Sequence, residues 1–130
     1  MQKRIAILGS TGSIGTQALE VISRHPDLFE VEVLTAHNNV DLLIEQSIRY
    51  KPNVVVIGNE ELYEGVRSAL ESHPIKVYCG ADAIAQVTTF ESVDMVLTAM
   101  VGFSGLKPTI EAIRAGILSL SPKSFEKIFL

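Results

Sequence analysis

A glycine-rich segment near the amino terminus constrains the fold of this chain more than any other feature. Residues 9–15 read Gly-Ser-Thr-Gly-Ser-Ile-Gly and directly follow the apolar run Ile5-Ala6-Ile7-Leu8. A buried strand that enters a glycine-rich turn and then a helix is typical of a nucleotide phosphate cradle. The first glycine permits the sharp turn, the second lets backbone N–H groups approach a pyrophosphate, and the third lets the helix pack on the sheet. The helix dipole attracts anions without a basic side chain.

The spacing of the glycines leaves the family of nucleotide-binding proteins open. The pattern G-x-x-G-x-x-G has one residue more in its first interval than the commonest dinucleotide motif. The position of the motif, directly after an apolar strand and before a helical pattern, is what favours nucleotide binding over a glycine-rich turn without a ligand.

The remainder of the chain alternates short apolar runs with segments of helical periodicity. This alternation predicts one α/β domain with a Rossmann-like, doubly wound parallel sheet and helices on both faces. We expect strands at about 4–8, 31–35, 54–57, 75–79 and 93–97, with a possible sixth near 118–120. We expect helices at about 13–24, 40–50, 60–72, 81–87 and 106–115, the last one ended by Gly116. The fourth strand is the most polar, which predicts a place near the sheet edge.

Composition excludes several classes of protein. The 130 residues, 47% hydrophobic and 20% charged, suit one globular domain. A net charge of −4 without a basic tract argues against a nucleic-acid partner, and no apolar run is long enough to cross a membrane. The single cysteine, Cys79, cannot form an internal disulfide, so we expect a reducing, cytoplasmic setting and a small core residue rather than a nucleophile.

The end of the second strand bears on the choice of cofactor. In NAD sites an acidic residue at this point holds the ribose 2′-hydroxyl, but here the chain reads Ala36-His37-Asn38-Asn39. Glu30 and Glu32 come too early in the strand to reach the ligand end. The absence of an acid favours NADP, and His37, Asn38 and Asn39 can donate hydrogen bonds to phosphate oxygens. Asn39 also suits the N-cap of the following helix, and the two roles are compatible.

The chain offers no catalytic set. His25, His37 and His73 are scattered, two of them before prolines, and no carboxylates stand at metal-ligand spacing. We therefore predict no catalytic and no metal-binding residue here, and expect other residues to present a substrate to the cofactor's hydride.

Three segments together give the chain a specific resemblance. They are residues 9–15, residues 99–109 (Ala-Met-Val-Gly-Phe-Ser-Gly-Leu-Lys-Pro-Thr) and residues 113–116 (Ile-Arg-Ala-Gly). With these segments the chain resembles the amino-terminal NADPH-binding domain of the 1-deoxy-D-xylulose 5-phosphate reductoisomerases. The first segment is shared with other reductases, whereas the second, following an apolar strand at this distance, is specific.

The resemblance implies a function and a set of contacts. The family isomerises 1-deoxy-D-xylulose 5-phosphate and reduces the intermediate with NADPH to 2-C-methyl-D-erythritol 4-phosphate, on the methylerythritol phosphate route to isoprenoids. It works as a homodimer with magnesium or manganese. The family's NADPH contacts fall on residues in three segments. These residues are Thr11, Gly12, Ser13 and Ile14, then His37, Asn38 and Asn39, and finally Ala99, Met100 and Val101 beside the nicotinamide half.

The sequence departs from the family pattern near its end. We assign residues 1–116 to the NADPH-binding domain and 117–130 to a divergent tail that replaces the start of the catalytic domain. Where the family has Leu-Ala-Asn-Lys-Glu, only Leu120 and Lys123 are retained. The metal-binding acids and substrate-phosphate groups of the family would lie beyond residue 130. We therefore expect a truncated or frame-slipped product that is inactive alone.

Two other functions stand as alternatives. One is a stand-alone dinucleotide-binding module without turnover, which would also bind NADPH. The other is a short-chain or semialdehyde dehydrogenase, which needs a Tyr-x-x-x-Lys pair or a catalytic cysteine. Tyr63 is followed four residues on by Arg67 and Tyr78 by Asp82, so the pair is absent.

Overall fold

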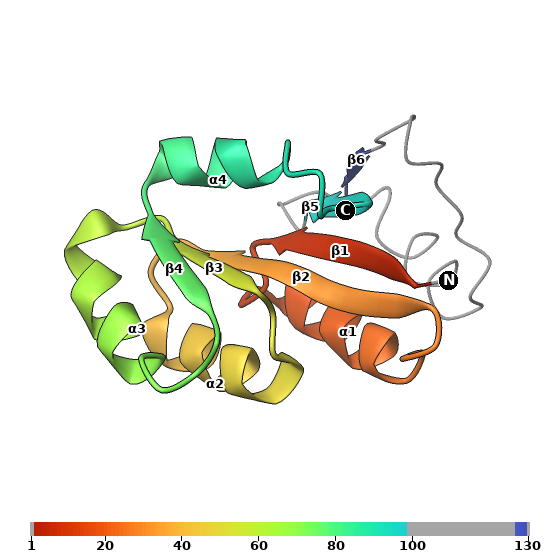
Figure 1. Ribbon diagram of the computed structural model, residues 1–130, viewed down its shortest axis with the longest axis horizontal. Helices are drawn as coiled ribbons and strands as arrows, with labels where there is room; N and C mark the ends of the chain where they lie inside the picture. Colours follow the sequence, from red (N-terminus) through yellow and green to blue (C-terminus); the bar gives the residue numbers. More distant parts are fainter. Residues whose placement is uncertain (1, 99–126, 130) are drawn as a thin grey trace.

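A six-stranded, wholly parallel sheet forms the centre of the molecule (Figure 1). The computed structural model describes residues 2–98 and 127–129. The strands lie in the order β4-β3-β2-β1-β5-β6. Their bounds are β1 (Lys3–Leu8), β2 (Phe29–Ala36), β3 (Val54–Ile57), β4 (Lys76–Cys79), β5 (Met95–Thr98) and β6 (Lys127–Phe129). The fourth strand lies at the sheet edge, as its polarity predicts.

Helices cover both faces of the sheet. The helical elements are α1 (Ser13–Ser23), α2 (Val40–Tyr50), the 3-10 turn η1 (Glu60–Leu62), α3 (Tyr63–Ala69) and α4 (Ala81–Val87). Helices α1, α2 and α3 lie on one face and α4 lies on the other (Figure 1). The prediction of a doubly wound parallel sheet is therefore confirmed.

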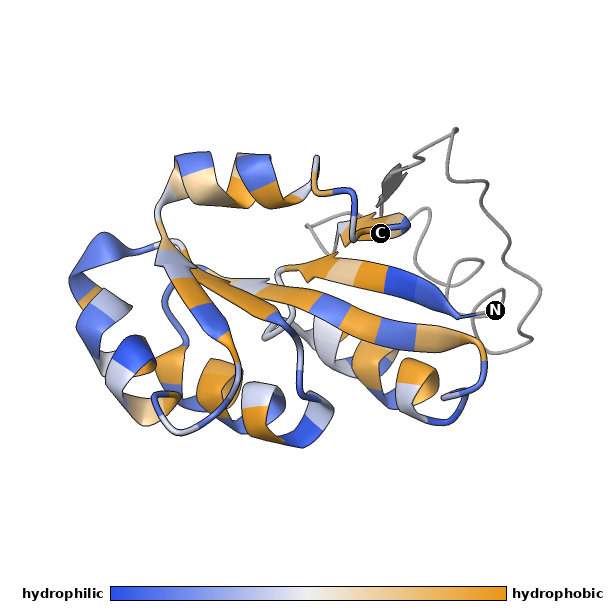
Figure 2. Ribbon diagram, in the orientation of Figure 1, coloured by the Kyte–Doolittle hydropathy of each residue, from blue (hydrophilic) through white to orange (hydrophobic). Residues whose placement is uncertain are grey.

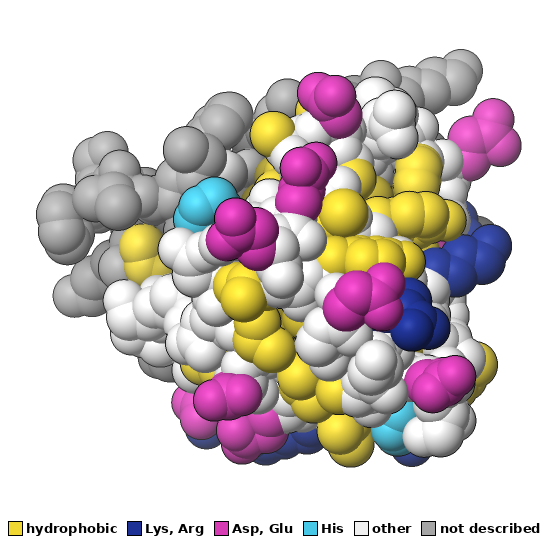
Figure 3. Space-filling model, turned by 90° about the vertical axis from the view of Figure 1, so that its left-hand side faces the viewer, with side chains coloured by type: hydrophobic (Ala, Val, Ile, Leu, Met, Phe, Trp, Pro, Cys, Tyr) yellow, Lys and Arg dark blue, Asp and Glu magenta, His cyan; other side chains and the backbone are white. Residues whose placement is uncertain are grey.

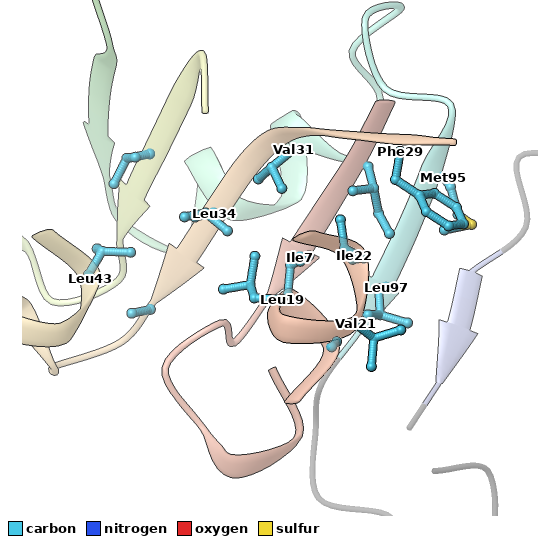
Figure 4. Close-up of a cluster of buried hydrophobic side chains, with 14 of the residues drawn as sticks. Ile7, Leu19, Val21, Ile22, Phe29, Val31, Leu34, Leu43, Met95 and Leu97 are labelled. Carbon is cyan, nitrogen blue, oxygen red and sulfur yellow. The ribbon is translucent and has the colours of Figure 1, made fainter. Parts of the chain in front are cut away.

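The core has one layer on each side of the sheet. On the α1–α3 side, Ile7, Leu34, Val55 and Leu97 of the strands belong to one buried cluster with the inner faces of the helices (Figure 4). On the α4 side, Ala6, Val33, Val56 and Val96 form a second cluster, joined by Val87 of the helix. Because successive strand residues point to opposite faces, a strand covered on both sides is mostly apolar. Figure 2 shows hydrophobic colour over much of the strands, interrupted by hydrophilic positions on β1, β2 and β4, and on the sheet-facing sides of the helices.

The bounds of several elements differ from the predicted ones. Strand β2 begins at Phe29, whose side chain is buried, and continues to Ala36. Strand β5 begins only at Met95, because Asp94 bonds through its side chain to the amide of Arg4. The helix expected over 60–72 is a 3-10 turn followed by α3, which ends at Ala69. Leu70 is the last residue to reach the core there, and the exposed Glu71 and Ser72 have no apolar group to bury.

Helix α2 has the predicted bounds but an unexpected inner face. Its buried residues are Leu43, Gln46 and Ser47, whereas Ile48 is 45% exposed. The buried positions follow the three- and four-residue spacing of one helix face, and Ile48 falls off that face. A polar side chain therefore occupies a core position that the apolar residues alone did not indicate.

Several predicted elements lie outside the described residues. These are the helix at 106–115, its end at Gly116 and the possible strand at 118–120. Strand β6 instead comprises Lys127–Phe129 and pairs in parallel with β5.

The β4 edge is visible in Figure 3, which views the molecule from the side of α3 and β4. Hydrophobic side chains form a band on this face, with acidic side chains scattered between them. Lys76 and Tyr78 of β4 are both exposed, and a lysine on an edge strand opposes pairing with another strand. Cys79, predicted to be a small core residue, is half-buried and packs against the larger core cluster.

Candidate functional site

The glycine-rich loop leaves the sheet where the strand order reverses. The chain builds β1, β2, β3 and β4 as successive neighbours and then returns to place β5 on the other side of β1. In open parallel sheets ligands bind beyond the carboxyl ends of the strands at such a reversal. The loop that follows Leu8 therefore occupies the position at which this architecture forms its ligand crevice.

Two of the three glycines are required by the fold of the chain, one for its backbone conformation and one for close packing. Gly9 has a φ of 80°, in the left-handed region that side chains disfavour. A Cβ on Gly15 would lie 2.4 Å from the carbonyl oxygen of Gly9 and 2.6 Å from the Cα of Ser10. Helix α1 thus rests directly on the loop, as the third glycine predicts.

Gly12 has no such internal reason to be glycine. Its φ of −75° and ψ of 170° suit any residue. The nearest atom that its Cβ would meet is the Gly9 oxygen, at an ordinary 3.7 Å. The described residues therefore leave the space above Gly12 open, and a side chain would fill it. This is the position at which a nucleotide phosphate cradle needs a bare backbone.

The first turn of α1 is open to an anion. Gly12 is its N-cap and provides no side-chain hydrogen bond. Among the described residues, none accepts a hydrogen bond from the N–H groups of Ser13, Ile14 and Gly15. The first turn of α1 also lacks an acidic residue, whereas Asp41 lies in that of α2 and Asp82 in that of α4. N–H groups that no described residue pairs and the helix dipole therefore act together at this turn.

The loop is anchored by two side chains that the sequence interpretation did not select. Thr35 of β2 accepts hydrogen bonds from the N–H of Gly9, through Oγ1 at 3.1 Å, and from the N–H of Ser10, through its carbonyl oxygen at 2.9 Å. Gln46 of α2 exchanges two hydrogen bonds with Ser10. A glutamine between Leu43 and Tyr50 on the inner face of α2 is the sequence signal that could have identified this anchor.

The segment after β2 lies next to the glycine loop. Leu8 pairs with Thr35, so the two loops leave neighbouring strands at the same sheet edge. His37, Asn38 and Asn39 are exposed there. Asn39 caps α2, its Oδ1 accepting from the N–H of Leu42 at 3.2 Å, as predicted. The Asn59 side chain donates to Oδ1 of Asn38 at 2.9 Å and fixes that amide beside the loop.

The acidic residues of β2 lie away from this edge. The buried Glu32 accepts a hydrogen bond from Nδ2 of Asn53 at 2.8 Å. Asn53 precedes β3, so this contact marks the amino-terminal end of the sheet. Hollows of about 490 and 400 Å³, both lined by Asn53 and Pro74, also lie at that end. The carboxyl end of β2 thus lacks an acid.

The structure brings together the predicted residues of the first two segments. Thr11 and Ile14 are half-buried, and Gly12 and Ser13 are exposed in the same turn. Ala99, Met100 and Val101 lie outside the described residues. Within residues 2–98 and 127–129, no three His, Cys, Asp or Glu side chains form a group that could hold a metal ion. No helix in that part of the chain is long and apolar enough to cross a membrane.

The sheet topology and the glycine loop define a Rossmann-type α/β domain. Residues 5–121 match the sequence model of the 1-deoxy-D-xylulose 5-phosphate reductoisomerase family. The chain belongs to this family. The match extends to residue 121, and the division at residue 116 stays a prediction.

Individual relatives agree with the family match. The chain is 60% identical over 116 residues to the 1-deoxy-D-xylulose 5-phosphate reductoisomerase of Phocaeicola vulgatus, covering 89% of this chain. Its fold is similar to that of the Zymomonas mobilis reductoisomerase in complex with NADPH (TM-score 0.73, 31% identity, 78% of this chain and 27% of that one). It is also similar to a reductoisomerase in complex with NADPH, fosmidomycin and magnesium (TM-score 0.72, 25% identity, 88% of this chain and 26% of that one). The chain spans 30% of the length of the Phocaeicola relative.

Proposed function

We propose that this chain is the NADPH-binding part of a 1-deoxy-D-xylulose 5-phosphate reductoisomerase. The observation that carries the proposal is the first turn of α1 at the strand reversal, where the described residues neither pair its N–H groups nor fill the space above Gly12. The Zymomonas relative, whose fold is similar, was solved with NADPH. Thr11, Gly12, Ser13 and Ile14 would hold the pyrophosphate through their backbone, since this turn contains no basic side chain.

The 2′-phosphate of the cofactor would lie at the segment after β2. His37, Asn38 and Asn39 are exposed at the same sheet edge as the glycine loop, and none of the three is acidic. The Asn39 side-chain oxygen caps α2, which leaves its amide nitrogen for a phosphate oxygen. From the family resemblance, Ala99, Met100 and Val101 are proposed to lie beside the nicotinamide half.

The reaction itself is proposed to need residues outside this chain. NADPH supplies a hydride when it is bound, and the family reaction also requires a group that presents the sugar phosphate. The described residues hold no ligand set for magnesium or manganese, so we assign no step through a metal to this chain. The role of the chain is to bind and orient the cofactor.

Binding and turnover are tested separately. Titration calorimetry of the chain with NADPH and NADH should show binding of NADPH, with NADH weaker. Absence of NADPH binding would overturn the proposal. The catalytic part of a close reductoisomerase, added with magnesium, should restore NADPH-dependent reduction of 1-deoxy-D-xylulose 5-phosphate. A chain that binds NADPH but never supports reduction in this assay would instead be a stand-alone binding module.

Homodimer formation and a cytoplasmic location are also proposed, on the family resemblance and the single cysteine. Light scattering of the chain joined to the catalytic part should give twice the protomer mass. A fluorescent fusion should distribute through the cytoplasm, and a fusion found in another compartment would contradict that location.

A further inference from the structure

Gln46 lies beneath the glycine loop, although it belongs to α2. Its side chain is 4% exposed, and Ser10 is 0% exposed. The Ser10 hydroxyl donates to Oε1 of Gln46 at 2.7 Å, and Nε2 of Gln46 donates to the Ser10 carbonyl oxygen at 2.8 Å. The Ser10 hydroxyl also donates to the Thr35 carbonyl oxygen at 3.3 Å, whereas the Ser10 carbonyl has Gln46 as its partner. A buried amide with both groups paired is a rigid contact, because a buried polar group left without a partner is costly.

The second of these hydrogen bonds fixes a peptide plane. The carbonyl of Ser10 and the N–H of Thr11 belong to one planar trans peptide unit, in which they point in opposite directions. Because Gln46 holds the carbonyl against α2, the Thr11 N–H must point away from α2. Among the described residues no acceptor bonds to that N–H.

We propose that Gln46 is a positioning residue for cofactor binding, which aims the Thr11 N–H at the cofactor pyrophosphate. The inference rests on the proposed binding of NADPH at this loop. Gln46 does not touch the cofactor and acts through Ser10. The same helix carries Asn39 at its first turn, so Gln46 also fixes the glycine loop relative to the element proposed to bind the 2′-phosphate.

Replacement of Gln46 by leucine tests the contact. In Gln46→Leu the buried Ser10 carbonyl loses its partner, so the peptide plane is released. Calorimetry should show a rise of about tenfold in the Kd for NADPH, the expected effect of one lost hydrogen bond at this strength. Hydrogen exchange of the segment 9–16 should become faster even without NADPH. The control is Gln86→Leu, which removes an exposed glutamine on α4 at the other face of the sheet and should change neither quantity.

Replacement of Gln46 by glutamate adds a second measurement, the pH dependence of the Kd for NADPH. A residue with a merely structural role would not affect this dependence. In Gln46→Glu the protonated carboxyl group can donate to the Ser10 carbonyl and accept from the Ser10 hydroxyl, as the glutamine does. The ionised carboxylate cannot donate and repels that carbonyl oxygen. Burial raises the pKa of such a carboxyl, so Gln46→Glu is neutral below that pKa and charged above it. The charged groups around the hollow beside Gln46 are Glu20 of α1 and Glu45 and Arg49 of α2, and the unsubstituted chain contains them too.

The Kd for NADPH is therefore measured over a series of pH values, and at each pH the Kd of the variant is divided by that of the unsubstituted chain. The NADPH Kd of Gln46→Glu should stay within about threefold of it near pH ~5.5 and exceed it by about tenfold near pH ~8.5. Gln86→Glu should give a ratio near one throughout. A flat ratio for Gln46→Glu, or an unchanged Kd and exchange rate in Gln46→Leu, overturns the inference. If Gln46→Leu does not fold, the pH series alone decides. Failure of the unsubstituted chain to bind NADPH overturns the proposed function and, with it, this inference.

Discussion

The Cα of Gly15 approaches the loop so closely that a side-chain carbon would lie 2.4 Å from the carbonyl oxygen of Gly9. Real Cβ atoms do not approach backbone oxygens to this distance. This close contact between two backbones therefore limits how α1 can pack on the turn before it. Gly12, three residues earlier, makes no such contact, so the glycines of one motif serve different purposes.

Gly15→Ala should destabilise the empty chain. The added methyl group must push α1 away from the loop, and overpacking of this kind costs about 1–3 kcal/mol. Urea denaturation followed by circular dichroism would show a lower midpoint. The same substitution at Gly65, where a Cβ meets nothing within 4 Å, is the matched control and should leave the midpoint unchanged or raise it. Equal midpoints for the two variants would contradict the packing argument.

Gly12→Asp should change stability and binding in opposite directions. An aspartate at this N-cap can accept from the first N–H groups of α1, which no described residue pairs, and it complements the helix dipole, so we expect a gain of about 0.5–1 kcal/mol. Its carboxylate would occupy the proposed phosphate position, and NADPH binding should be lost. Thermal denaturation and calorimetry measure the two effects. Gly12→Asn separates them, because it caps the helix without adding charge. A chain that is stabilised and still binds NADPH normally would refute the assignment of the loop.

Asn39→Asp should alter cofactor preference. Aspartate is as good an N-cap as asparagine, so α2 remains capped. The added negative charge would lie at the proposed 2′-phosphate position and should weaken NADPH binding by about tenfold or more, with NADH changed much less. Asn39→Ala is the companion variant, since it removes the cap and should cost about 1 kcal/mol of stability. Equal effects of Asn39→Asp on both cofactors would place the 2′-phosphate elsewhere.

Asp94→Ala should loosen the junction of β1 and β5. Oδ2 of Asp94 accepts from the Arg4 backbone N–H at 2.8 Å and from Arg4 Nε at 3.3 Å. With the Asp94 side chain only 17% exposed, the loss should cost about 1–2 kcal/mol in urea denaturation.

Glu64→Ala is the control for Asp94→Ala. The Glu64 carboxylate bonds to the exposed Arg67 and raises the pKa of that guanidinium, but both side chains are in water. This variant should leave the urea midpoint where it was. A larger effect for Glu64→Ala than for Asp94→Ala would contradict the importance of the β1–β5 contact.

The sheet and the glycine loop could be predicted because local patterns determine them. The run Val54–Ile57 has the β-branched residues of a strand covered on both faces, and it is one. The bounds of α2 follow from Asn39 at its start and from Lys51, which takes a left-handed conformation before Pro52. Where an end depends on a distant contact, prediction failed. Strand β5 starts late because Asp94 bonds to Arg4, a partner far away in the sequence.

The partners of the anchors at the candidate site could not be predicted for the same reason. Gln46 is a polar residue that anchors the loop through hydrogen bonds to Ser10, and nothing near it in the sequence indicates that partner. In the sequence Thr35 is an ordinary strand residue, whereas in the structure its Oγ1 accepts a hydrogen bond from the N–H of Gly9. Ile48 is apolar, yet it lies off the inner face of α2 and is 45% exposed.

The return of the chain from β4 to β5 has a consequence for the order of folding. Strands β1 to β4 lie side by side in the sheet in the order in which they occur along the chain. β1 acquires its second neighbour only when the segment around Asp94 arrives, and such a non-local contact is slow to form because a long loop must close first. Until that step, the edge of β1 that later pairs with β5 has no neighbouring strand. We therefore expect the crevice between β1 and β5 to assemble after the β1–β4 part of the sheet, and bound cofactor to stabilise the docking of β5 on β1.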